Sequence, residues 1–498
     1  MNVLLITLDQ FRGDCLSSAG HPVVRTPALD ELAAGGVRLA RHYSQAAPCA
    51  PGRASLYTGM YQMNHRVVAN GTPLDARFDN VAKTARRAGY DPVLFGYTDQ
   101  SIDPRQATGR HDPRMQHYTG VLPGFRPLLH IPDDHQVWLD WLAERGHTGL
   151  GGGYDALGTE PSRPAELSVS AFLTDHAIDW LRQQVGERPW FAHLSYLRPH
   201  PPYAAAGHFA EMYDPAEVTL PIEPAQPADA RHWLHRVLLG ITGAAAPTDE
   251  AGLRHLLAQY YGMISEVDAQ LGRVWTTLRE LGMWDDTVIV VTADHAELAG
   301  DHGLVGKLAW FEPSYRILGI VRDPATAEAH GTVVEAFTEN IDLFPTICEA
   351  IGAPIPSQCD GLPLTPFLHD EEPPWWRDAA HWEFDWRDAL LERGEQRPLD
   401  DDGWPWQRRL EEMHLAALRD DAGLYVQFGD GSWRCFDLAA DPSGRTEVDD
   451  PSRVLDYAQR MLVWRSRHAD RTHTHMLVKD GGIGRFPPEP MVVETPNP

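Results

Sequence analysis

The sequence predicts a protein of the α/β class, with a large, mixed, mostly parallel sheet sandwiched between helices and a smaller antiparallel sheet near the C-terminus. Three observations support this prediction. The chain has 498 residues, of which 43% are hydrophobic, so it can bury a sizeable core. Short apolar runs alternate with amphipathic segments. From about residue 375 the composition shifts to dense Trp, Asp, Arg and Glu. We therefore expect an α/β domain over residues 1–374, a small α+β subdomain over 375–470, and an arm or tail over 471–498.

The apolar runs of the first domain are predicted to be strands, because near-continuous apolarity is typical of strands covered on both faces. They are residues 3–8, 92–97, 190–196, 287–293 and 317–321. The amphipathic segments between them are predicted to be helices. They are residues 26–34, 80–89, 168–184, 252–281 and 340–351.

Three further segments carry structural expectations of their own. Residues 111–135 form a loop-like insertion, rich in aromatic and histidine residues, which either lines a pocket or only covers the sheet edge. The sequence Gly-Asp-Gly at 429–431 predicts a hairpin between two alternating runs. From Thr472 onward the chain is rich in Pro and Gly, which predicts either a disordered tail or an arm around a neighbouring subunit. We expect a homo-oligomer, a dimer or a tetramer.

The overall charge and the cysteine usage limit the partners and the compartment. A formal charge of -27 excludes nucleic acid and anionic lipid surfaces as partners, so we expect a small molecule. Five scattered cysteines do not suit a disulfide framework. The apolar start is too short for a membrane span and has no basic leader. The cytoplasm is therefore the expected location, with no membrane contact.

Polar side chains follow the predicted strands directly, at the edge where α/β proteins place their chemistry. Asp9 and Gln10 follow the first strand, and Asp294 and His295 follow the fourth. Two carboxylates and an imidazole suit a divalent metal such as Mg, Ca or Mn, and Gln10 could add a carbonyl oxygen. The alternative is that these carboxylates only cap helices.

Lys307 is one of only three lysines in a chain that otherwise uses arginine. It follows Asp294 and His295 without an intervening strand, so its loop can return it to them. A compact ammonium group binds a tetrahedral oxyanion as a point donor. The alternative is an ordinary surface lysine.

Cys49 stands two residues before Pro51 and four before Arg53. As a packed residue it needs neither neighbour. As a thiolate nucleophile it would share its site with a metal and carboxylates, which is an unusual combination. Neither interpretation explains the spacing.

The same stretches resemble a known family. "CAPGRASLYTG" is similar to the sulfatase signature C-x-P-x-R, and "ADHAELAGDHGLVGK" resembles the second metal-binding stretch of these enzymes. "NIDLFPTICEAIG" and "FDLAADPSGRTEV" resemble two further sulfatase segments. The resemblance runs from Asp9 to about Val448 and implies the alkaline phosphatase superfamily and its fold.

The resemblance implies that Cys49 is oxidised to formylglycine by a maturation enzyme that reads Pro51 and Arg53. The hydrated aldehyde has two hydroxyls: one, held on the metal, attacks sulfur or phosphorus, and the other then expels the product. The implied metal ligands are one set, namely Asp9, Gln10, the residue made from Cys49, Asp294 and His295.

The resemblance also assigns roles around this centre. Lys307 and Asn70 stabilise the negative charge of the transition state, and Arg53 steadies the diol and its carboxylate neighbours. His200, in "RPHPPY", protonates the departing oxygen.

Departures from the common arylsulfatase pattern indicate the phosphonate monoester hydrolase branch. Tyr97 and Thr98 stand where common arylsulfatases have a lysine and a nearby histidine. Less positive charge around the anion favours monoanionic esters over a dianionic phosphate. We expect a sulfate ester hydrolase. The alternatives are a phosphonate monoester or phosphodiester hydrolase using the same residues, and a catalytically silent anion-binding protein in which Cys49 stays a thiol.

Overall fold

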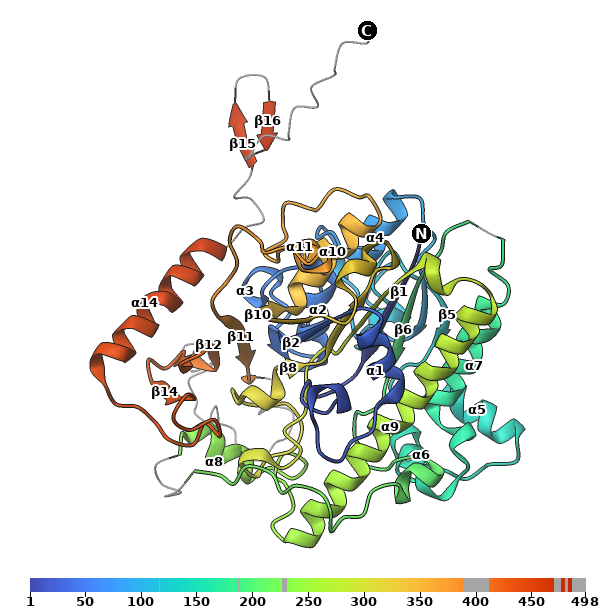
Figure 1. Cartoon of the computed structure of the whole chain (residues 1–498), viewed down its shortest axis with the longest axis horizontal. Coiled ribbons are helices and arrows are strands. Elements are labelled where there is room, and N and C mark those ends of the chain that lie inside the picture. The colour runs from blue at the N-terminus through green and yellow to red at the C-terminus, as the bar shows by residue number, and fades with distance from the viewer. Residues whose placement is uncertain are drawn as a thin grey trace.

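The computed structural model describes residues 1–115, 117–186, 188–225, 231–387 and 412–469, and the backbone of residues 476–479 and 482–485. Within these residues the chain forms a large mixed sheet, a separate smaller sheet and a two-stranded hairpin (Figure 1). The predicted fold class is confirmed.

The large sheet has the strand order β10-β2-β9-β7-β1-β6-β4-β5, and β8 pairs with β2 outside this path. Its strands are β1 (Asn2–Leu8), β2 (Val37–Tyr43), β4 (Val93–Gly96), β5 (Arg126–His130), β6 (Phe191–Tyr196), β7 (Thr287–Thr292), β8 (Arg316–Ile317), β9 (Gly319–Arg322) and β10 (Val333–Glu339). The neighbours β7, β1, β6, β4 and β5 are parallel to one another, whereas β9 and β8 run antiparallel to their partners. Four strands predicted from apolar runs are confirmed, and the fifth is divided into β8 and β9.

Strand β1 is apolar throughout because helices cover both faces of the sheet. Leu4, Ile6 and Leu8 belong to one core, with residues of α1 (Pro27–Ala34), α7 (Val169–Leu181) and α9 (Glu250–Glu280). Val3 and Leu5 belong to the other, with residues of α2 (Cys49–Thr58), α4 (Val81–Arg87) and α10 (Leu343–Ala350). Successive side chains of a strand point to opposite faces, so an amphipathic β1 would leave one core incomplete.

The remaining helices among the described residues are short, apart from α14 of the small sheet. They are α3 (Gln62–His65), α5 (Gln136–Glu144), α6 (Gly153–Gly158), α8 (Trp233–Leu239) and α11 (Thr365–Leu368). No helix in the described part of the chain is long and apolar enough to cross a membrane.

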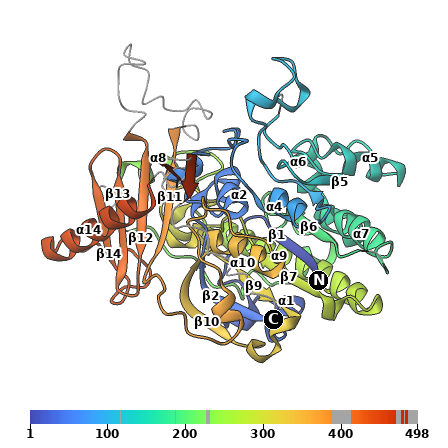
Figure 2. The same cartoon turned by 90° about the horizontal axis from the view of Figure 1, so that it is seen from above.

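The small sheet lies beside the main body, as Figure 2 shows. Its strands β11 (Ala380–Asp385), β12 (His414–Arg419), β13 (Gly423–Phe428) and β14 (Trp433–Asp437) are antiparallel, and the hairpin predicted at 429–431 joins the last two. Helix α14 (Pro451–His468) packs on the sheet through Tyr457, Met461 and Trp464. The fifth strand, β3 (Ala46–Ala47), comes from just before Cys49 and pairs with β11. The small sheet is therefore joined to the segment that carries Cys49, and the domain boundary at residue 374 stays a prediction.

The predicted arm or tail is described only in part. Strands β15 (Met476–Lys479) and β16 (Gly482–Arg485) form an antiparallel hairpin that lies away from the main body in Figure 1. The rest of residues 471–498 lies outside the described residues.

The prediction that residues 111–135 form only a loop-like insertion was wrong for one part. Residues 126–130 form β5, which pairs with β4 at the end of the sheet. Arg126, Pro127 and Leu128 are exposed, as an edge strand permits, and the segment therefore lacks the apolar run of a central strand.

Candidate active site

Four neighbouring strands of the large sheet bring the predicted site residues together. The strands β7, β1, β6 and β4 are adjacent in this order and parallel, so their carboxyl ends meet at one edge. Asp294 and His295 follow β7, Asp9 and Gln10 follow β1, and Tyr97 follows β4. His200 follows β6 after a short turn.

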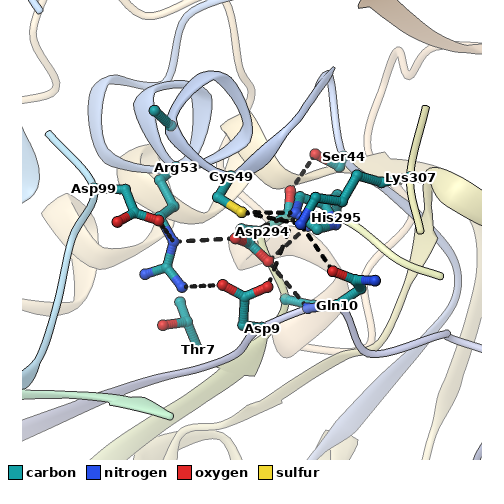
Figure 3. A network of polar contacts seen from close by, with 12 residues as sticks. Thr7, Asp9, Gln10, Ser44, Cys49, Arg53, Asp99, Asp294, His295 and Lys307 are labelled. Carbon is teal, nitrogen blue, oxygen red and sulfur yellow. Dashed lines mark hydrogen bonds and ion pairs between the residues drawn. The ribbon is translucent and has the colours of Figure 1, made fainter. Parts of the chain in front are cut away.

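Cys49 is the first residue of α2 and faces this edge (Figure 3). Its Sγ lies 3.3 Å from Nε2 of His295 and 3.3 Å from Nζ of Lys307. The free N–H groups of a first helical turn favour negative charge nearby. Burial and the neighbouring Asp9 raise the pKa of the thiol well above its usual range. The unmodified cysteine is therefore a poor thiolate here, which disfavours thiol-based catalysis.

Gly52 allows α2 to approach the end of β7. A Cβ at this position would lie 2.3 Å from the main-chain oxygen of Asp294 and 2.9 Å from that of Ala46. Both distances are far below van der Waals contact. The glycine inside the C-x-P-x-R stretch therefore sets the distance between Cys49 and the carboxylates, a role that the sequence analysis missed.

Four buried residues form a group with the geometry of a metal site. One ligand atom from each of Asp9, Cys49, Asp294 and His295 lies within 4.8 Å of the others. Oδ1 of Asp9 is buried and has no hydrogen-bond partner. Nδ1 of His295 donates to the carbonyl oxygen of Ala296 at 3.1 Å, which leaves the Nε2 lone pair directed at the group. These donors fit a divalent cation.

Arg53 holds the carboxylates in place from the opposite side. Its guanidinium is fully buried and lies 3.1 Å from Oδ2 of Asp9, 3.0 Å from Oδ2 of Asp294 and 3.7 Å from Oδ2 of Asp99. Oγ of Ser195 accepts a further bond at 2.8 Å. Because Arg53 bonds with Oδ2 of Asp9, Oδ1 of Asp9 stays available to a metal, whereas Oδ1 of Asp294 accepts from the main-chain N–H groups of Gln10 at 3.2 Å and His295 at 3.0 Å.

The buried charges at this edge are not balanced by the side chains alone. Burial raises the pKa of Asp294 to about 7 and that of Asp99 to about 8, and the charge of Asp9 adds to both shifts. Burial also lowers the pKa of His295 to about 3, so the imidazole is neutral. Burial opposes ionisation of Asp9 too, but nearby positive groups including Arg53 outweigh it and hold its pKa below the usual range. An additional cation would allow all the carboxylates to ionise.

Lys307 lies inside the site and not on the surface. Its Nζ donates to Oε1 of Gln10 at 2.9 Å as well as to Sγ of Cys49. The Gln10 amide group donates in turn to the buried Glu297, which also accepts the main-chain N–H groups of Ala299 and Gly306. Metal binding by Gln10 stays a prediction, because its carbonyl oxygen here accepts from Lys307. The sequence analysis missed Glu297, whose role depends entirely on these tertiary contacts.

A cavity opens beside Cys49, and most predicted side chains line it. The predicted lining residues are Asp9, Cys49, Asn70, Tyr97, His200 and Lys307. The phenol of Tyr97 donates to Oδ2 of Asp9, and Oδ1 of Asn70 accepts from the main-chain N–H of Ala50 at 2.9 Å. Nδ1 of His200 donates to the carbonyl oxygen of Pro201 at 2.7 Å.

Thr98 does not line the cavity. Its hydroxyl donates to the carbonyl oxygen of Gly120 at 2.8 Å and accepts from the main-chain N–H of Leu122 at 2.8 Å. The side chain therefore joins the end of β4 to the inserted segment.

The inserted segment forms the wall of the cavity, which answers the question left open for residues 111–135. Its contributions are Tyr118, Ile131, Pro132, Asp133 and His135, and Tyr154 completes the wall from α6. Asp99 and Leu197 also line the cavity. No sequence motif marks these residues, because only the packing of the insertion places them here.

Comparison with known proteins agrees with this geometry. A protein-family model described as "Sulfatase" matches residues 1–353. The "Multifunctional alkaline phosphatase superfamily protein PehA" of Trinickia caryophylli is 37% identical to this chain, over 97% of this chain and 98% of its own length. An "Arylsulfatase" of Clostridium perfringens is 26% identical over 93% of each chain. The crystal structure of a phosphonate monoester hydrolase of Agrobacterium radiobacter superposes with a TM-score of 0.85 at 39% identity, covering 97% of this chain and 99% of that one.

Proposed function

Because this chain belongs to the sulfatase family of the alkaline phosphatase superfamily, we propose that it hydrolyses sulfate monoesters with a formylglycine made from Cys49 and one divalent metal ion. It is a hydrolase that acts on sulfuric or phosphonate esters. The observation that carries the proposal is the position of Cys49 at the start of α2, within one buried group with Asp9, Asp294 and His295.

When bound, the metal supplies a Lewis acid, and the formylglycine supplies the nucleophilic hydroxyl. Asp9, Asp294 and His295 hold the metal, with Gln10 as a further candidate ligand. Arg53 fixes the orientation of the two carboxylates. The metal is Ca, Mg or Mn, since all three bind hard oxygen ligands.

The remaining side chains bind the ester and move a proton. Lys307 donates to the oxygens of the anion, and Asn70 and Tyr97 lie in the same cavity. Nδ1 of His200 donates to Pro201, so Nε2 is the nitrogen left for the departing oxygen, and it would give that oxygen a proton when the ring is in its imidazolium form. A single lysine, and no arginine, lines the cavity among the described residues, which suits an ester with one negative charge.

Phosphonate monoester or phosphodiester hydrolysis by the same side chains is the second candidate. The similarity to the Agrobacterium enzyme favours it, since it extends over nearly the whole of both chains. The charge balance of the cavity suits sulfate monoesters, phosphonate monoesters and phosphodiesters alike, because each is a monoanion.

The test has two parts. Mass spectrometry of the peptide that contains Cys49, from a host with the formylglycine-generating enzyme, establishes whether the thiol is converted. Steady-state rates are then compared for 4-nitrophenyl sulfate, 4-nitrophenyl phenylphosphonate and the dianionic 4-nitrophenyl phosphate. We expect kcat/KM for a monoanionic ester to exceed that for the phosphate by about 100-fold or more, and Cys49→Ala to lose the activity. An unmodified thiol with no activity in metal-loaded protein would instead support the silent anion-binding alternative.

We also propose a cytoplasmic homo-oligomer, a dimer or a tetramer, that is matured by the formylglycine-generating enzyme. The hairpin β15–β16 supports the oligomer, because it lies away from the main body of its own chain (Figure 1). Light scattering of the full chain and of a truncation after Thr472 tests it. A monomer in both cases would contradict the proposal.

A further inference from the structure

The wall that the inserted segment and α6 form on the cavity has a composition that anion binding does not explain. Among the described residues that line the cavity, the inserted segment and α6 contribute one carboxylate, from Asp133, and the aromatic rings of Tyr118, His135 and Tyr154. Burial lowers the pKa of His135, so this ring is neutral. An anionic group is repelled by this wall and must lie at the Lys307 side.

The wall lies where the leaving group departs. The ring of Tyr154 is 6.4 Å from that of His200, the residue that would protonate the leaving oxygen, and 5.5 Å from that of His135. Nδ1 of His135 donates to the main-chain oxygen of Asp133 at 2.7 Å. The phenol of Tyr118 is close enough to the Asp133 carboxylate that each group shifts the pKa of the other. The ring of Tyr154 therefore lies near both His200 and the segment that carries Asp133.

The carboxylate of this wall, from Asp133, is not paired with a cationic side chain in the part of the chain that the structure describes. Asp133 is half-buried and forms no ion pair in the described residues, and burial and the charge of Asp9 raise its pKa. Asp99, on the same cavity, is 3% exposed; its Oδ2 lies 3.7 Å from the Arg53 guanidinium, and its Oδ1 is buried without a hydrogen-bond partner. A positive charge in the cavity would stabilise the ionised form of Asp133.

We propose that this wall binds a leaving alcohol that carries a positive charge, such as a quaternary ammonium or alkylammonium group, so that zwitterionic esters are preferred substrates. Tyr118 and Tyr154 offer π-faces to the cation, and Asp133 offers its countercharge. The inference rests on the proposed ester hydrolysis and adds the class of the leaving group. No new chemical step is required: the ester oxygen takes its proton from His200, and the cation leaves unchanged.

A matched pair of substrates isolates the charge. The choline ester of phenylphosphonic acid and its 3,3-dimethylbutyl ester have nearly the same shape, and only the first carries the positive charge. The pair of choline sulfate and 3,3-dimethylbutyl sulfate repeats the comparison at sulfur. With metal-loaded, formylglycine-containing protein we expect kcat/KM to favour the choline ester by about tenfold or more, and we expect added salt to reduce the preference.

Two neighbouring carboxylates provide the variant and its control. Asp133→Asn removes the charge in the cavity, whereas Asp134→Asn removes the same charge from an exposed side chain that does not line the cavity. We expect Asp133→Asn to bring the choline preference close to one and Asp134→Asn to leave it unchanged. Tyr154→Leu tests the aromatic contribution and should lower the preference several-fold. If Asp133→Asn does not fold, Tyr154→Leu still tests whether the wall causes the preference for the choline ester.

The outcomes separate this inference from the proposed function. If the esters of a pair react equally fast, the inference is overturned and the proposed function stands. If no ester reacts although formylglycine and metal are confirmed, the proposed function fails, and titration calorimetry with tetramethylammonium then tests the wall alone. Binding that Asp133→Asn weakens and Asp134→Asn does not would support the wall. Absence of binding would overturn it.

Discussion

At the scale of single residues, Arg53 determines how the carboxylates of the centre are arranged. Its planar guanidinium directs N–H groups to Asp9, Asp294 and Ser195 at once, at 3.1, 3.0 and 2.8 Å. A lysine has the same charge, but its compact ammonium cannot reach partners in such different directions. Shape as well as charge is therefore required at this position.

Arg53→Lys tests this requirement. We expect it to weaken metal binding and to lower kcat/KM by about 100-fold, because the two carboxylates lose their common partner. Metal titration of the chelator-treated protein and steady-state rates measure both effects. Arg279→Lys is the matched control, since Arg279 is exposed on α9, far from the centre, where it pairs with Glu31 and lies over the ring of Trp284. Equal activity in both variants would show that charge alone is sufficient.

Gly52→Ala tests the close approach of α2 to β7. The added Cβ would overlap the main-chain oxygen of Asp294 at 2.3 Å, so α2 and Cys49 must move away from the carboxylates. We expect a loss of about 2 kcal/mol or more in unfolding free energy together with a large loss of activity. Denaturant unfolding and rate measurements give the two values. Gly272→Ala, on α9, is the control, because its added Cβ would lie 3.6 Å from the nearest atom, an ordinary contact. Replacing a glycine inside a helix by alanine should leave the unfolding free energy unchanged or raise it by up to about 1 kcal/mol. An active, stable Gly52→Ala would refute the steric argument.

The sequence predicted the residues whose place in the site follows from strand ends, and missed those that depend on packing. Asp9, Asp294 and His295 follow apolar runs, and a parallel sheet must bring such positions together. Glu297, Asp99 and Asp133 acquire their roles only when the loops pack, which no spacing encodes. The hydroxyl of Thr98, a predicted site residue, bonds with the main chain of the insertion, and a role in catalysis stays a prediction.

At the scale of elements, α1 depends on α9 for its N-terminal cap. Thr26, at the N-cap position, makes no side-chain cap bond. The carboxylate of Asp268, on α9, accepts instead from the main-chain N–H groups of Ala28 at 3.0 Å and Leu29 at 2.8 Å. The long helix therefore satisfies donors of the short one, and the two helices form one stable unit on this face of the sheet.

Asp268→Ala should lower the unfolding free energy by about 1–2 kcal/mol, because it leaves these buried N–H groups without acceptors. Asp175→Ala is the control: Asp175 is half-exposed on neighbouring α7 and pairs with Arg273, so we expect a change below about 0.5 kcal/mol. Denaturant unfolding measures both. Equal losses would show that the Asp268 contacts contribute no more than a surface ion pair.

The elements that the sequence missed are those near the sheet edges. β2 and β10 alternate between buried and partly exposed residues, as in "VRLARHY", so they lack the continuous apolarity of β1. β5 is exposed over its first three residues. Continuous apolarity detects only strands that helices cover on both faces, and these lie at the centre of the sheet.

At the scale of the whole molecule, the large acidic excess extends into the interior. The side chain of Glu266, on α9, is fully buried. It shares its surroundings with Glu160, whose carboxylate pairs with Arg198, also buried. The guanidinium pairs with Glu160, whereas neither carboxylate oxygen of Glu266 has a hydrogen-bond partner among the described residues, so Glu266 is easier to bury with a proton than with a charge.

Glu266 should make the stability of the protein depend on pH. Burial, and then the charge of Glu160, raise its pKa from 4.5 to about 7, while Arg198 opposes the shift. Between these two pH values the folded state binds more protons than the unfolded state, so stability is greatest at low pH within this window and falls as pH rises through 7. The loss by pH 8 should be on the order of 1–3 kcal/mol. The side chain of Glu266→Gln cannot ionise. We therefore expect this variant to be more stable than the wild type at pH 8, and its unfolding free energy to depend less on pH. Glu280→Gln is the control, because Glu280 is exposed at the end of the same helix, and it should follow the wild type. Denaturant unfolding from pH 5 to 8 gives the unfolding free energy of the wild type and both variants as a function of pH. Parallel curves for Glu266→Gln and the wild type would show that the buried carboxyl group does not titrate in this range.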